Sequence, residues 1–405
     1  MKWIIDLARF YVRSFSGLNK YVWLLGLVML INRSGTMIIT FMSLYATEEL
    51  CLSYTQAGII MGAFGLGSIL GSFIGGKLTD KINYYDIQWS SLTISGLIAF
   101  SMYFVRDFYP ILFLVFAFSL TADTFRPANA IAVSTYAKKE NITRSFSLMR
   151  LAINLGFTIG PAVGGVVAQH YGFKWIFVLE GATCLLAALA LVSFLPKKHA
   201  LKSHEESRST DKGNKVIHDL VFIKFLIFTF LFAFCFFQLF TSVPLYMHDL
   251  WGYSTETIGY ILSLNGLLIV MVEMPLITKV DGKRSNFRFI QLGCILLALS
   301  YLILIAPLNA IVIVLLFISI ITFAEIFAMP FMMNFVITRP AKRRQGEYIA
   351  LYSIAYGLSH ITAPSVGLYI AENYNFIVLY SFIALLAFAT AWGFYILSKS
   401  QIENA

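Results

Sequence analysis

Residues 156–165 read Gly-Phe-Thr-Ile-Gly-Pro-Ala-Val-Gly-Gly and lie within an apolar run from 145 to 169. A helix needs about 20 apolar residues to cross the hydrocarbon core of a bilayer, so this run is long enough. Glycines at this spacing let a second helix approach closely, while proline removes a backbone donor and permits a bend. The stretch therefore predicts a membrane-spanning helix that packs and moves rather than binds substrate.

Apolar runs of similar length fill most of the chain. Of its 405 residues, 59% are hydrophobic and 13% are charged, against about 25% charged in a typical soluble protein. A water-soluble protein is therefore excluded, and little chain remains for a domain outside the membrane. We expect twelve spans, at residues 21–45, 56–78, 88–105, 110–136, 145–169, 173–195, 221–246, 255–278, 287–306, 309–337, 346–371 and 376–397.

These spans predict an all-α integral membrane protein made of two six-helix bundles. The only long polar segment separates the two groups of spans and has the composition of a flexible linker. The expected parts are a cytoplasmic amphipathic segment 1–20, a bundle 21–195, a cytoplasmic linker 196–220, a second bundle 221–397 and a cytoplasmic tail 398–405.

The basic residues predict the orientation. Of the 30 Lys and Arg residues, 24 fall on one predicted side of the membrane, and only Arg106 and Lys174 fall on the other. Because basic residues concentrate in cytoplasmic loops, both termini are expected in the cytoplasm, with the spans in the cell (inner) membrane. The net charge of +9 is then a topology signal and requires no nucleic-acid partner.

The two groups of spans are also related in sequence. Matched Gly and Pro residues recur at a nearly constant offset of 201 to 203 residues, as in Gly58 and Gly259, Gly65 and Gly266, Pro127 and Pro330, and Pro161 and Pro364. Parallel six-helix repeats with a binding site between them near the midplane are typical of secondary transporters that work by alternating access.

Two motifs resemble those of the major facilitator superfamily. Residues 76–81, Gly-Lys-Leu-Thr-Asp-Lys, resemble its loop signature, although Asn83 and the two tyrosines after it replace a glycine and a basic pair. Residues 156–165 are similar to the glycine-proline pattern of its antiporter branch. Arg126 falls where the fourth-helix motif places a basic residue. The resemblance covers essentially the whole chain and is greatest to bacterial multidrug-type drug:proton antiporters.

The resemblance implies conformational roles for two sets of residues. Asp80 would help to hold the two bundles together, and the glycines of the second motif would allow helices to pack and bend. The implied conformational residues are Gly76, Asp80, Lys81, Gly156, Gly160, Pro161, Gly164 and Gly165.

Charges inside spans are the strongest functional candidates, because a charge at mid-bilayer costs roughly 2.5–3.5 kcal/mol. Asp123 and Arg126 are three residues apart in the fourth span and share a helix face, and Arg33 could join them in one cluster. A carboxylate in an apolar cavity can exchange a proton near neutral pH. Asp123 and Glu325, assisted by Arg126, are therefore the expected proton carriers. The alternative is a static structural ion pair.

Other polar and aromatic residues predict a substrate cavity. An amphipathic, aromatic cavity would suit apolar or cationic organic molecules. Glu273 and Glu180 also lie in spans, and Glu180 is expected to pair with a lipid-interface group or a neighbouring helix. The residues expected to line the cavity are Asn32, Arg33, Gln238, Tyr246, Tyr352, Tyr356 and His360, although a lone histidine such as His360 is more often a hydrogen-bonded core residue.

The leading hypothesis is a monomeric transporter that exports small organic, amphipathic or drug-like molecules in exchange for protons. An importer or uniporter of a peptide, sugar or metal chelate is the alternative, and Arg33 with Arg126 would suit an anionic substrate. The third hypothesis is a membrane enzyme or an assembly scaffold. Because no Walker loop, nucleophile elbow or zinc-ligand spacing is present and the four cysteines lie far apart, we expect no enzymatic activity, cofactor or metal. The proton gradient is the expected energy source.

Overall fold

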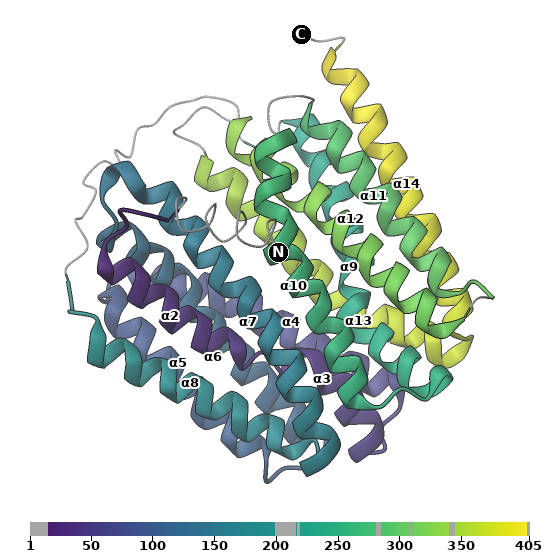
Figure 1. The fold of residues 1–405 in the computed structure, drawn as a ribbon, viewed down its shortest axis with the longest axis horizontal. Coiled ribbons are helices and arrows are strands. Elements are labelled where there is room, and N and C mark those ends of the chain that lie inside the picture. The colour runs from purple at the N-terminus through teal and green to yellow at the C-terminus, as the bar shows by residue number, and fades with distance from the viewer. Residues whose placement is uncertain are drawn as a thin grey trace, which may run out of the picture. The chain divides into compact units, whose positions relative to one another are not determined.

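The computed structural model describes residues 15–198, 216, 219–280, 285–307, 309–339 and 345–402. Helices dominate these residues, and none of them lies in a β-strand (Figure 1). Most of the predicted segment 1–20 and linker 196–220, and the end of the tail, fall outside them. The α-helices among the described residues are α2 (Lys20–Ser34), α3 (Ile38–Leu44), α4 (Tyr54–Thr79), α5 (Tyr84–Met102), α6 (Phe108–Tyr136), α7 (Ile142–Tyr171), α8 (Lys174–Phe194), α9 (Leu220–Trp251), α10 (Thr255–Val280), α11 (Asn286–Leu304), α12 (Ala310–Thr338), α13 (Gln345–Asn373) and α14 (Phe376–Ile402).

Each predicted span corresponds to one long stretch of helix within the described residues. The first span comprises α2, α3 and a π-helical turn, η1 (Tyr45–Glu49), and the other eleven are single helices. Ten of the twelve are long and apolar enough to cross a membrane. The two that fall short, α5 and α13, carry more polar side chains. The prediction of an all-α membrane protein with twelve spanning helices is confirmed.

The first span is broken in the middle, which the apolar run 21–45 does not indicate. α2 ends with Gly35 as its C-cap, and α3 begins at Ile38. At the break, the Thr36 hydroxyl donates to the Arg33 carbonyl at 2.6 Å. A helix end inside a membrane leaves backbone groups that need other partners, and one buried side chain supplies them, as described below.

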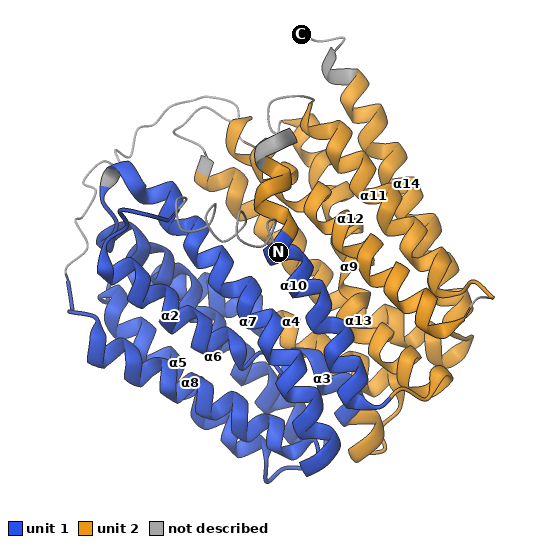
Figure 2. Ribbon diagram, viewed as in Figure 1, with its two compact units in different colours: residues 1–45, 67–204, 254–271 blue, residues 46–66, 205–253, 272–405 orange. Residues whose placement is uncertain are grey.

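The chain forms two compact units, which Figure 2 shows in different colours. Unit 1 comprises residues 1–45, 67–204 and 254–271, and unit 2 comprises residues 46–66, 205–253 and 272–405. Each unit therefore includes a segment from the opposite half of the sequence: the first part of α10 belongs to unit 1, and the first part of α4 belongs to unit 2. The predicted bundles 21–195 and 221–397 stay a prediction.

The same packing pattern occurs in both units. In unit 1, α2 packs against α7 and α8, and α5 packs against α6 and α8. In unit 2, α9 packs against α13 and α14, and α11 packs against α12 and α14. The pairs match when the first half of the sequence is shifted onto the second, so the repeat read from the sequence is also a repeat in packing.

The first helix of each half is anchored to the end of its fourth helix. Asn19 caps α2, and its side-chain amide donates to the Tyr136 carbonyl at 3.0 Å. Asp219 caps α9 and pairs with Arg339, with both N–O distances at 2.7 Å. Burial opposes ionisation of Asp219, but hydrogen bonds from Arg339, a backbone amide and a tyrosine outweigh it and hold the pKa of Asp219 below its ordinary value.

Candidate functional site

A buried carboxylate in α6 forms the centre of the candidate site. Arg126 Nε lies 2.6 Å from Asp123 Oδ1, one helical turn away, and the hydroxyl of Ser68 in α4 donates to the other carboxylate oxygen. The Asp123 side chain is 5% exposed, whereas the Arg126 side chain is 53% exposed. The predicted shared face of Asp123 and Arg126 is confirmed. Their contacts couple the charge on Asp123 to both α6 and α4.

Arg33 completes the cluster that the sequence predicts in the first half. It lies in the last turn of α2, just before the break, and interacts electrostatically with Asp123, Arg126 and Glu180. Its Nε is buried and has no hydrogen-bond partner among the described residues. A guanidinium has five N–H donors, and leaving such a donor buried and unpaired is costly. Arg33 therefore carries a buried donor that no described residue satisfies. Its neighbour Asn32 donates to Cys184 Sγ at 3.7 Å.

Glu180 contacts a neighbouring helix, which is one of the two partners that the sequence predicts for it. One carboxylate oxygen accepts hydrogen bonds from the backbone amides of Met37 and Ile38, at 2.8 and 3.0 Å. These amides begin α3, and a helix N-terminus attracts a negative charge. The partner of Glu180 on this helix is therefore the backbone rather than a side chain. The Gly-Thr pair at 35–36 in an apolar run was the signal for this break.

Several predicted cavity residues come together in unit 2. The Tyr352 and Tyr356 rings lie 4.9 Å apart between centroids, and Phe237 of α9 lies 6.2 Å from Tyr356 and 3.6 Å from His360. Glu325 of α12 is half-buried and interacts electrostatically with Tyr356. The structure thus places a carboxylate beside an aromatic cluster, and the roles predicted for these residues stay predictions.

Gln238 and Tyr246 make their contacts elsewhere. Gln238 Nε2 donates to the Ala363 carbonyl at 2.8 Å, so it joins α9 to α13. The Tyr246 hydroxyl donates to the Leu304 carbonyl at 3.2 Å, and its ring contacts Trp251 at 4.9 Å. Both side chains are buried and serve helix packing. Glu273 in α10 is also buried.

The glycines of residues 156–165 face two neighbours. A Cβ at Gly156 would lie 2.4 Å from the Arg33 Cβ, so α7 approaches the end of α2 closely. Gly160 and Gly164 continue this face along the break and α3. Gly165 faces α10, where a Cβ would lie 3.1 Å from the Gly259 Cα. The motif therefore packs against the broken first helix on one side and against a helix of the second half on the other.

Residues 76–81 lie at the end of α4. The Thr79 hydroxyl donates to the Gly76 carbonyl at 2.6 Å, and Asp80 and Lys81 are exposed beyond the last turn. Asn83, where this loop departs from the family signature, caps α5 by accepting a hydrogen bond from the Tyr85 amide at 2.9 Å. The departure thus has a local structural role.

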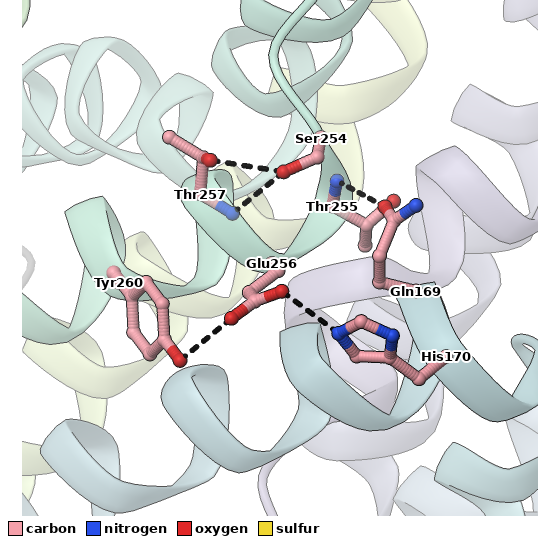
Figure 3. A network of polar contacts seen from close by, with 7 residues as sticks. All are labelled: Gln169, His170, Ser254, Thr255, Glu256, Thr257 and Tyr260. Carbon is pink, nitrogen blue, oxygen red and sulfur yellow. Dashed lines mark hydrogen bonds and ion pairs between the residues drawn. The ribbon is translucent and has the colours of Figure 1, made fainter.

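Polar contacts bind the start of α10 to the end of α7 (Figure 3). Gln169 accepts a hydrogen bond from the Thr255 amide at 3.1 Å, and His170 Nε2 lies 3.0 Å from Glu256 Oε2. The Tyr260 hydroxyl donates to the other Glu256 oxygen at 2.8 Å. The sequence reasoning missed these residues because the two pairs that join α7 to α10 are each 86 residues apart in the chain.

Comparison with known proteins agrees with this arrangement. The family model for the Major Facilitator Superfamily matches residues 22–364. The chain belongs to the Major Facilitator Superfamily. Multidrug resistance protein 2 of Bacillus subtilis is 26% identical over 253 residues, which cover 60% of this chain and 62% of that protein. The Na(+), Li(+), K(+)/H(+) antiporter of Planococcus maritimus is 23% identical over 92% of this chain and 95% of that protein.

A solved structure shares the fold of this major facilitator protein. A POT family transporter in complex with 5-aminolevulinic acid matches with a TM-score of 0.81, over 96% of this chain and 99% of that chain, at 15% identity. The resemblance inferred from residues 76–81 and 156–165 is therefore confirmed. The protein is a multi-pass membrane transporter of the superfamily, with drug-resistance and antiporter relatives.

Proposed function

We propose that this transporter exports small organic, amphipathic or drug-like molecules in exchange for protons, by alternating access across the cell membrane. Both termini would lie in the cytoplasm, and the monomer would need no cofactor. The observation that carries the proposal is the Asp123–Arg126 pair inside a membrane-spanning helix. The drug-resistance and antiporter relatives support the same function.

The pair has the chemistry that proton coupling needs. Ionised Asp123 holds Arg126 and accepts a hydrogen bond from Ser68. A proton on Asp123 removes the charge that holds Arg126 and turns one of the two acceptor oxygens into a donor, so the contact with Arg126 weakens. Because the Arg126 guanidinium is exposed and a charge in lipid is costly, we infer that it faces the aqueous path of the substrate. Glu325 would be a second proton carrier.

Reconstituted liposomes test this proposal with ethidium as the probe. We expect an imposed pH gradient to drive ethidium transport by the wild type, and Asp123→Asn to reduce that flux at least about tenfold while gradient-independent ethidium exchange persists. Asp86→Asn is the matched control, because Asp86 also pairs with a basic residue, Lys197 at 2.6 Å, but at a helix end. Two results would contradict the proposal: wild-type ethidium transport that does not respond to the pH gradient, or pH-driven transport that persists in Asp123→Asn.

Arg33 favours a second candidate, uptake of an anionic substrate such as a peptide or metal chelate. Its buried Nε has no hydrogen-bond partner among the described residues, and a carboxylate would satisfy it. Whole cells distinguish the two candidates: an exporter depletes the cell of its substrate, whereas an importer accumulates a labelled anion. Arg33→Lys would retain uptake better than Arg33→Gln only if the charge of Arg33 binds the substrate.

A further inference from the structure

Three potential metal ligands converge in unit 2, whereas Asp123 belongs to unit 1. Glu48 is in η1, at the end of the first span, and His248 and Asp249 are in the last turn of α9. One ligand atom from each residue lies within 4.8 Å of those of the other two. The side chains of Glu48, His248 and Asp249 are 39%, 29% and 23% exposed, so an ion in solution can reach them. We call these three residues the Glu48 cluster.

The distances between ligand atoms in the Glu48 cluster are close to those around a tetrahedral metal ion. His248 Nδ1 lies 3.5 Å from Glu48 Oε1 and 2.8 Å from Asp249 Oδ1. Zinc binds histidine nitrogen and carboxylate oxygen at about 2.0–2.2 Å, so tetrahedral ligand atoms lie about 3.4 Å apart. The two observed separations lie on either side of this value, and small side-chain adjustments would complete the geometry.

Hydrogen bonds from His248 can satisfy only one of the two carboxylates in the Glu48 cluster, whereas a bound metal ion would contact all three side chains. The single Nδ1 of His248 faces two carboxylates but can carry only one proton, which can be donated well to only one of them. Two carboxylates and a neutral imidazole attract a divalent cation. The hydroxyl of Tyr54 donates to the second oxygen of Asp249. Such an outer hydrogen bond orients a carboxylate ligand in metal sites.

We propose that Glu48, His248 and Asp249 bind a divalent transition-metal ion, best fitted by zinc, with a fourth position open to water. The bound ion ties η1 to the end of α9. It therefore opposes any movement that separates these two helix ends, and zinc acts as an inhibitor of transport. The site was invisible in the sequence because Glu48 is 200 residues from His248. Binding does not depend on which substrate is carried or on proton coupling.

Zinc titration of the full-length protein in lipid nanodiscs tests the proposal. We expect the wild type to bind one more zinc ion than His248→Ala, with Glu48→Gln weakening this extra site at least about tenfold. His170→Ala is the matched control, because His170 also contacts a glutamate at a helix end but belongs to no group of three potential metal ligands among the described residues. His199, His204 and His218 are present in all variants, so any zinc bound to them cancels in the comparison.

The outcomes separate a metal site from its alternatives. Equal binding by wild type and His248→Ala, or an equal loss in His170→Ala, would overturn the proposal. Calcium binding as tight as zinc binding would also overturn it, because it would indicate general attraction by the carboxylates. Thermal unfolding without zinc checks that each variant folds. In liposomes, zinc should slow wild-type ethidium exchange but not that of His248→Ala.

Discussion

At the scale of single residues, two buried acids among the described residues of the first half, Asp123 and Glu180, have different contacts. Asp123 pairs with an exposed arginine and a hydroxyl, so its contacts depend on its charge. Glu180 is buried and holds two backbone amides at the start of α3. These contacts support the proposed proton coupling at Asp123 and a structural role for Glu180.

Glu180→Leu should destabilise the protein more than Glu180→Gln. Leucine leaves the Met37 and Ile38 amides buried without their acceptor, at a cost of about 1–3 kcal/mol for each unsatisfied group. Glutamine keeps an oxygen that can accept these hydrogen bonds. Thermal unfolding in nanodiscs measures the difference, and equal midpoints for Glu180→Leu and the wild type would show that the cap contributes no stability.

At the scale of elements, two helix crossings correspond to each other in the sequence repeat. A Cβ at Gly259 in α10 would lie 2.3 Å from the Pro161 carbonyl of α7, and one at Gly58 in α4 would lie 2.8 Å from the Pro364 carbonyl of α13. Gly58 corresponds to Gly259 and Pro161 to Pro364 in the sequence repeat. Each crossing joins a helix of the first half to one of the second, so close approach of backbones is a shared feature of both.

Gly259→Ala and Gly58→Ala should therefore both lower stability. The added methyl group meets backbone, which must move apart, and overpacking of this kind costs about 1–3 kcal/mol. Gly76→Ala is the control, since nothing lies within 4 Å of a Cβ there and alanine favours a helix. Thermal unfolding midpoints should fall for the first two variants only. A similar fall for Gly76→Ala would indicate a general effect of glycine replacement.

At the scale of the whole molecule, the distribution of basic residues predicts which ends of the helices face the cytoplasm. Twenty-four of the 30 Lys and Arg residues fall on one predicted side. Cys51 lies between η1 and α4, on the side predicted to be outside, and is the exposed cysteine, whereas Cys184, Cys235 and Cys294 are buried. The natural chain therefore carries its own probe of orientation.

A membrane-impermeant maleimide should label the wild type from outside in right-side-out vesicles. The reason is that Cys51 is exposed and lies on the side poor in basic residues. Cys51→Ser should remove the label, which confirms the site. Labelling only after the vesicles are permeabilised would contradict the predicted orientation and show that both termini lie outside.

The sequence by itself determined the twelve spans, the family and the Asp123–Arg126 pair. Apolar runs of spanning length are local features set by transfer from water to lipid, and residues three apart on a helix are neighbours in any fold. The constant offset of matched Gly and Pro residues likewise predicted that the packing repeats.

Only the tertiary structure decided which helix faces meet. It placed Glu180 against the Met37 and Ile38 amides, more than 140 residues away, and it gave Gln238 and Tyr246 packing roles. It also brought Glu48 to His248. The physical reason is that these helices are apolar on most of their surface, so hydrophobic periodicity, which identifies the buried face of a soluble helix, gives little information about which face contacts a neighbour. Partners far apart in the chain become known only when the helices pack.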